Sequence, residues 1–201
     1  AWVGALLASF SIAQLFGAAI LGRLSDRWGR RPVMLISLVG SCASFVATGF
    51  STTLWQLMIS RALAGLFGGS IATAQAYVAD VTKPEERARY MGLIGASIGM
   101  GFVLGPFLGA EMARYGFSAA SFVAAGLSLI DLGMAALFLK EPPRSGSPRV
   151  RITLPQALAQ PDLGRLLGAA FVTSFAFVGM EATFALLAKQ RFNLGPAAMG
   201  R

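Results

Sequence analysis

Six long apolar stretches constrain the fold of this 201-residue chain more than any other feature. They fall at about residues 1–22, 33–50, 54–79, 90–113, 117–139 and 166–188. Each is long enough to cross a hydrocarbon core of roughly 30 Å as a helix, because a helix rises about 1.5 Å per residue. The chain is 55% hydrophobic and 13% charged, with a mean hydropathy of +0.65, an apolar excess too large for one soluble core. The sequence therefore predicts an all-α polytopic membrane protein with six transmembrane helices.

Basic residues gather in alternate connections between these stretches and so indicate the orientation. Three connections hold most of them: Arg23, Arg27, Arg30 and Arg31, then Lys83, Arg87 and Arg89, then Lys140, Arg144, Arg149, Arg151 and Arg165. The connection at 49–53 has no charge, and Arg114 is alone in the connection after the fourth stretch. Because Lys and Arg are enriched in cytoplasmic loops, we expect the basic connections on the cytoplasmic side and the start of the chain on the outer side.

Composition also argues against several classes of function. The net charge of +8 does not indicate a nucleic-acid partner, because the basic residues lie in short loops and form no continuous face. The sequence has no His and one Cys, Cys42, so neither an internal disulfide nor a structural zinc site is expected. It shows no Ser-His-Asp or Cys-His constellation. We therefore expect no enzyme, metal or cofactor.

The first connection has an unusual sequence. Gly22-Arg23-Leu24-Ser25-Asp26-Arg27-Trp28-Gly29-Arg30-Arg31-Pro32 places five charges in a short turn. We expect Gly22 to permit close helix approach, and Asp26 and Arg30 to bind groups of opposite charge at neighbouring helix ends, as an electrostatic latch. A plain positive-inside loop would need the arginines but neither Asp26 nor both glycines. The run resembles the signature between the second and third helices of Major Facilitator Superfamily transporters.

Asp80 lies at the predicted cytoplasmic end of the third stretch. In the resembled family an acidic residue at this place pairs with the Arg of the loop signature. The resemblance therefore implies an inner-gate charge cluster of Asp26, Arg30 and Asp80, within a motif that also includes Gly22, Gly29 and Arg31. A solvated helix end is the alternative interpretation of Asp80.

The fourth stretch carries a pattern of small residues around a proline: Gly92, Gly101, Gly105, Pro106 and Gly109. This spacing resembles the signature of the antiporter branch of the same family, except that Ala110 stands where a final Gly is usual. Gly101, Gly105 and Gly109 recur every four residues, which predicts a stripe for close helix contact, and Pro106 is expected to bend the outer half. An ordinary packing face would explain the glycines but not the proline.

Arg61 lies about two turns into the third stretch, where an unpaired cation is energetically expensive. Four residues share its direction within about 40° on a continuous helix: Gly65, Gly68, Ala72 and Gln75. This predicts a cavity-facing strip with a cation at one end and an amide at the other. Leu57, Arg61 and Gly65 also resemble the third signature of the family, whose Arg is implied in proton transfer, although Ala64 departs from it. An Arg that snorkels to the interface is the alternative.

Two carboxylates fall inside apolar stretches. Asp131 lies near the middle of the fifth and Glu181 in the outer half of the sixth. Ionisable groups at such depth are candidates for proton coupling or for pairing with a cationic substrate. A buried, hydrogen-bonded acid with a structural role is the alternative for each.

The three signatures together resemble proton-coupled drug antiporters of the Major Facilitator Superfamily, nearest the tetracycline-efflux and multidrug group. This implies a secondary transporter that exports drugs or related amphiphilic molecules in exchange for protons, monomeric at full length, in the plasma membrane of a bacterium. The chain would be a fragment from the second to the seventh helix. Residues 1–139 would form most of the N-terminal half, 140–163 the cytoplasmic linker and 164–201 the start of the C-terminal half. A metabolite symporter or facilitator of the same superfamily, or a membrane scaffold, is the alternative.

Overall fold

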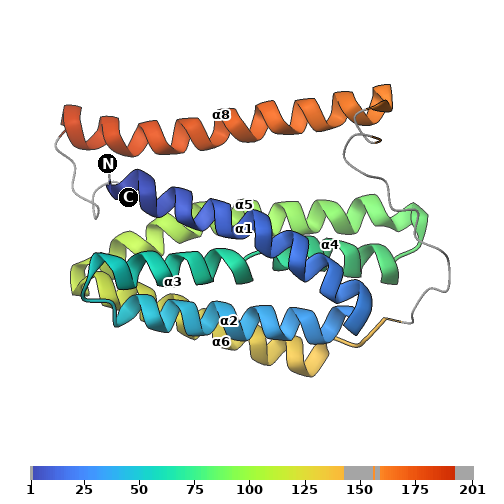
Figure 1. Cartoon of the computed structure of the whole chain (residues 1–201), viewed down its shortest axis with the longest axis horizontal. Coiled ribbons are helices and arrows are strands. Elements are labelled where there is room, and N and C mark those ends of the chain that lie inside the picture. Colours follow the sequence, from blue (N-terminus) through green and yellow to red (C-terminus); the bar gives the residue numbers. More distant parts are fainter. Residues whose placement is uncertain (1, 143–155, 157–158, 193–201) are drawn as a thin grey trace. The chain divides into compact units, whose positions relative to one another are not determined.

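The computed structural model describes residues 2–142, 156 and 159–192, and these form helices joined by short connections (Figure 1). In chain order these are α1 (Trp2–Trp28), α2 (Arg30–Gly49), α3 (Leu54–Phe67), α4 (Ser70–Val81), α5 (Pro84–Met112), the 3₁₀ helix η1 (Ala113–Tyr115), α6 (Phe117–Phe138) and α8 (Pro161–Phe192). Within this described part, six segments are long and apolar enough to cross a membrane, α3 and α4 together forming one. The prediction of an all-α membrane fold with six spans is confirmed.

The chain divides into two compact units, residues 1–145 and 146–201, and α8 belongs to the second. In the first unit, α1 packs mainly on α3, while α2 packs on α6 and α3. Figure 1 shows α1 crossing the line of α3 and α4, with α2 and α6 side by side. The finer division of the chain into a transporter half, a linker and a second half stays a prediction.

The charged run between the first two stretches is helical, so the expectation of a loop there was wrong. α1 continues to Trp28 and α2 begins at Arg30, which leaves Gly29 alone between them. Gly29 has a φ of 110°, a conformation that glycine adopts without steric cost. Because one residue with positive φ reverses the chain, the flanking charged residues can remain in helical turns. α5 and α8 likewise begin earlier than predicted, each at a proline suited to a first helical turn.

Small residues set the crossing of α1 with α3 and α4. A Cβ added at Gly17 would overlap the main chain of Leu66, and one at Gly65 would overlap the carbonyl of Phe10. A Cβ at Gly69 would meet the main chain of Ala18. Lipid gives no hydrophobic force between helices, so backbone-to-backbone contact of this kind supplies the packing energy in a membrane.

The buried side of α2 carries hydroxyl groups in place of large apolar side chains. Ser37, Ser44 and Thr48 are buried, and each donates its hydroxyl to the carbonyl four residues earlier. The Thr48 hydroxyl also lies 3.0 Å from the Ser60 hydroxyl of α3. Large apolar residues such as Leu15 and Leu137 instead lie exposed on the outside. This arrangement suits a helix bundle whose surrounding solvent is hydrocarbon.

Candidate functional site

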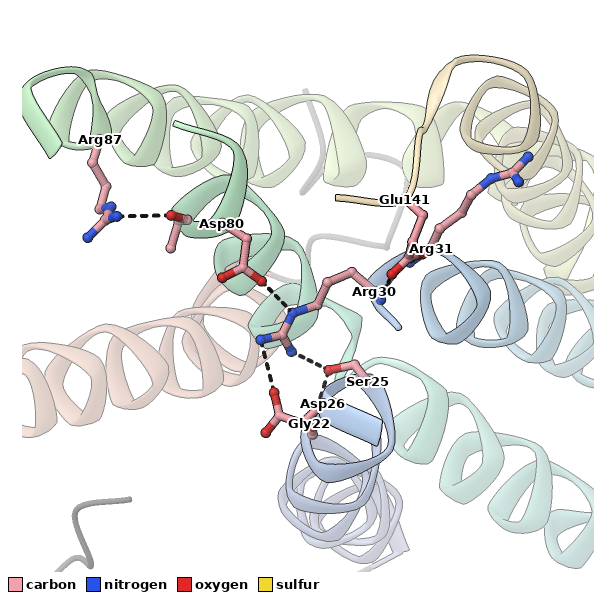
Figure 2. A network of polar contacts seen from close by, with 9 residues as sticks. Gly22, Ser25, Asp26, Arg30, Arg31, Asp80, Arg87 and Glu141 are labelled. Atoms are coloured by element: carbon pink, nitrogen blue, oxygen red, sulfur yellow. Dashed lines mark hydrogen bonds and ion pairs between the residues drawn. The ribbon is translucent and has the colours of Figure 1, made fainter. Parts of the chain in front are cut away.

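Arg30 connects the inner ends of three helices through its guanidinium (Figure 2). From the first turn of α2, its Nη2 lies 2.9 Å from Asp26 Oδ1 in the last turns of α1. Its Nε donates to Asp80 Oδ2 at 3.0 Å, at the inner end of α4. Its Nη1 donates to the hydroxyl of Ser25. A planar guanidinium with five donors can hold several acceptors at once, which a Lys ammonium on its flexible stem does less precisely.

Glu141 adds a fourth connection that sequence reasoning missed. Its Oε1 accepts from the main-chain N–H of Arg30 at 2.7 Å, and its Oε2 accepts from the N–H of Arg31 at 2.8 Å. These amides belong to the first turn of α2, where N–H groups lack helical partners and the helix dipole favours a negative charge. An acid directly after the fifth apolar stretch was the available signal, but it was assigned to the linker. We call Ser25, Asp26, Arg30, Asp80 and Glu141 the inner charge cluster.

The remaining motif residues support this cluster in different ways. The Arg31 guanidinium donates to the Ala136 carbonyl of α6 at 2.9 Å. A Cβ at Gly29 would overlap the Glu141 carboxylate, so a side chain at this position would displace that carboxylate from the start of α2. At Gly22 an added Cβ would meet no described residue within 4 Å. The close helix approach expected at Gly22 therefore finds no partner in the described part of the chain, and its carbonyl instead accepts from Ser25 at 2.8 Å.

Burial differs among the charged members of the inner charge cluster. The Arg30 side chain is 9% exposed, that of Asp80 18% and that of Asp26 37%. Removing one partner of a buried ion pair costs about 3–5 kcal/mol, because the other charge remains desolvated. The Arg30 and Asp80 pair is therefore the firmest contact, and the more exposed Asp26 contributes less. Chemically, the cluster can hold the inner ends of α1, α2 and α4 and the segment after α6 together, and it can separate when water enters.

Arg61 is exposed on α3, and no described residue gives it a hydrogen bond or an ion pair. The cavity-facing strip predicted from it is interrupted. The helix stops at Phe67, and Gln75 lies on α4 beyond the break at Gly68 and Gly69. Gly65 is buried against Phe10 of α1. The prediction assumed one continuous helix whose small residues face open space. In the structure, Gly65 instead allows α1 to approach α3 closely.

The glycine pattern of the fourth stretch lies on α5, with Pro106 inside the continuous helix. A Cβ added at Gly92, Gly101, Gly105 or Gly109 would meet no described residue within 4 Å. The predicted close contact thus has no partner in the ranges that the structure describes, and the packing role of this stripe stays a prediction.

The two intramembrane carboxylates are placed differently. Asp131 is exposed on α6 and lines a cavity between α2, α4 and α6. Glu181 falls within α8, in the second unit, and its side chain lies outside the described part. The described residues contain no group of three or more acidic, His or Cys side chains that could hold a metal ion.

Comparisons with known proteins agree with this architecture. The family described as Major Facilitator Superfamily matches residues 2–200. The tetracycline resistance protein, class H, of Pasteurella multocida is 39% identical over 138 residues, covering 69% of this chain and 34% of that protein. The class G protein of Vibrio anguillarum is 36% identical over 205 residues, covering 98% of this chain and 52% of that protein.

Among solved structures, the crystal structure of the human organic anion transporter MFSD10 (TETRAN) matches with a TM-score of 0.75 and 29% identity. That match covers 98% of this chain and 52% of the human one. The chain therefore spans between a third and about half of the length of these relatives. Since the family match extends over nearly the whole chain and the six-span helical fold agrees with it, the chain belongs to the Major Facilitator Superfamily.

Proposed function

We propose that the chain is part of a secondary transporter that exports small amphiphilic molecules in exchange for protons by alternating access. The observation that carries this proposal is the inner charge cluster, in which Arg30 binds acceptors from α1 and α4 while Glu141 binds the start of α2. The similarity to tetracycline resistance proteins supports a drug or drug-like substrate.

The inner charge cluster acts in this proposal as a latch on the cytoplasmic side of the outward-open state. Its contacts are polar and partly accessible, so they form when the helix ends meet and exchange for water when the ends separate. A transported molecule or proton shifts the balance only by binding one of the two states more tightly. The two ion pairs of Arg30 gain little net free energy, because desolvation offsets much of their attraction, and this suits a latch that must both hold and release.

Coupling to protons requires a group that changes its protonation during the cycle. The permanently charged guanidinium of Arg61 does not supply such a group. In this proposal Arg61 orients water or a nearby carboxylate, Gln75 lines the same pathway, and Asp131 or Glu181 binds a proton or a cationic substrate. The stripe of Gly101, Gly105 and Gly109 around Pro106 packs tightly against a further helix and limits leak.

The test uses the full-length protein that contains this chain, in everted membrane vesicles and in purified form. We expect tetracycline accumulation driven by a proton gradient, and proton release when tetracycline is added to the purified protein. Glu181→Gln or Asp131→Asn should reduce that release, and Gly105→Leu should lower the drug gradient at equal expression. If tetracycline and other cationic or zwitterionic drugs are not moved, the proposal is wrong.

A second candidate is the transport of an organic anion. Arg61 favours it, because an exposed cation within a span, with no described partner, can bind a carboxylate or sulfonate. The name of the human relative points the same way. Uptake of fluorescein into the same vesicles, lost in Arg61→Gln but retained in Arg61→Lys, would favour this candidate over drug export.

A further inference from the structure

The inner end of α4 lacks main-chain donors for its last carbonyl groups. The helix ends at Val81. In a continuing helix, the carbonyls of Ala79 and Asp80 would accept from the N–H groups of residues 83 and 84. Residue 83 lies between α4 and α5, and Pro84 has no N–H to donate. The last turn of α4, which carries Asp80, therefore depends on side chains or water for its donors.

Arg87, near the start of α5, supplies one of these donors (Figure 2). Its Nη2 donates to the Ala79 carbonyl at 2.9 Å. Its main-chain N–H donates to the Lys83 carbonyl at 3.1 Å, which fixes the point from which the side chain reaches back to α4. The Ala79 carbonyl belongs to the peptide bond that joins Ala79 to Asp80, and the Asp80 carboxylate accepts from Arg30 Nε at 3.0 Å. Arg87 therefore binds the main chain directly beside the acid that binds Arg30.

The place of Asp80 also favours a second cation beside Arg30. A helix carries a partial negative charge at its C-terminal end, so an acid in the last turn of α4 is disfavoured by its own helix. The guanidinium of Arg87, bound at the same helix end, offsets this effect. The first turn of α5 already holds Glu85 and Glu86, which suit the partial positive charge there. The charge of Arg87 thus benefits α4 and not the helix that carries it.

A similar contact occurs beside the acid that binds the main chain of Arg30. Glu141 follows α6, and Arg31 donates to the Ala136 carbonyl in the last turn of that helix at 2.9 Å. The inner ends of α4 and α6 therefore both present an acid to the start of α2, and both have a carbonyl bound by an arginine from another helix.

We propose that Arg87 is a positioning residue for the inner charge cluster. By binding the Ala79 carbonyl, it fixes the last turn of α4 and so holds the Asp80 carboxylate within reach of Arg30. Without Arg87 the ion pair still has both partners, but the last turn of α4 is free to fray. The inference rests on the proposed function, in which the cluster is the cytoplasmic latch, and it adds a residue that acts on the latch from α5.

The first test measures initial rates of tetracycline accumulation in everted vesicles that contain the full-length protein at matched expression. Arg87→Gln should lower the maximal rate roughly threefold and leave the KM unchanged, because it alters the latch and not the drug site. Arg87→Lys should retain most of the rate, since an ammonium also donates to a carbonyl. Arg89→Gln is the matched control: it removes the same charge from an exposed residue to which no described residue gives a hydrogen bond or an ion pair. Equal rates in Arg87→Gln and Arg89→Gln would overturn the proposal.

A second test separates the positioning of Asp80 from a simple cap on α4. The midpoint of thermal unfolding of the purified full-length protein is measured for Arg87→Gln in the wild-type and in the Asp80→Asn background. We expect a clear fall in the first and a much smaller one in the second, because the two residues act through one ion pair with Arg30. Equal falls would mean that Arg87 only caps α4, which would also overturn the proposal. This measurement uses no substrate, so it decides the role of Arg87 even if the vesicles move no tetracycline, a result that would contradict the proposed function alone.

Discussion

Glu141 accepts a hydrogen bond of 2.7 Å from the main-chain N–H of Arg30, across 111 positions of the sequence. The Arg30 side chain meanwhile binds Asp26 and Asp80. One residue at the start of α2 is thus held through its main chain by the segment after α6 and through its side chain by α1 and α4. Because Arg30 makes both kinds of contact, substitution of Arg30 or of one of its partners should show how much each contact of the cluster contributes.

Glu141→Gln should destabilise the full-length protein by about 1 kcal/mol, the usual effect of losing a helix cap. The carboxylate accepts from Arg30 and Arg31 through separate oxygens, and in the amide an NH₂ donor replaces one of these oxygens and would face an N–H donor. Thermal unfolding of the purified protein measures the change. Glu85→Gln, at the exposed start of α5, is the control for the loss of one charge. An equal effect of both variants would contradict the capping role.

Gly29→Ala should destabilise the protein by roughly 1–2 kcal/mol or more, because its φ of 110° strains an L residue and the new Cβ meets the Glu141 carboxylate. Gly22→Ala has open space among the described residues and should be neutral or slightly stabilising. Thermal unfolding of the two variants measures whether these two glycines of one motif differ in their contribution to stability. A larger effect at Gly22 would show that a helix outside the described residues packs there.

Arg30→Lys should lose most transport although it keeps the charge. A single ammonium cannot reproduce the divergent bonds to Asp26, Asp80 and Ser25. Tetracycline accumulation in everted vesicles, corrected for the amount of protein inserted, measures the loss. Arg27→Lys is the control, since Arg27 is exposed in the last turn of α1. Full activity in Arg30→Lys would show that transport requires only a positive charge at this position.

Asp80→Asn should impair transport more than Asp26→Asn. Its side chain is 18% exposed against 37% for Asp26, so the ion pair that Arg30 loses in Asp80→Asn is the one less accessible to water. Both variants should insert into the membrane normally, because the spans are unchanged. Efflux rates at matched expression give the order, and normal efflux in both would contradict the latch.

Gly17→Val should lower stability by about 1–3 kcal/mol, because its side chain would displace the main chain of α3 at Leu66. Gly126→Val on α6 is the matched control, since no described residue lies within 4 Å of its Cβ position. Thermal unfolding in detergent is the measurement. Equal tolerance of the two changes would mean that the crossing of α1 and α3 adapts to a side chain.

The sequence by itself determined the six spans, because hydrophobic length is a local property of the chain. The orientation expected from the charge of the loops stays a prediction. The family resemblance also indicated that Asp26, Arg30 and Asp80 form one charge cluster. Only the tertiary structure decided that Glu141 caps α2, since a cap supplied from a distant helix leaves no local pattern. The same holds for Gly17 and Gly65: whether a glycine faces a cavity or a neighbouring backbone depends on which helix lies against it. The open pocket at Asp131 likewise depends on residues of α2, α4 and α6 that lie together only in the fold, which no periodicity within one helix can predict.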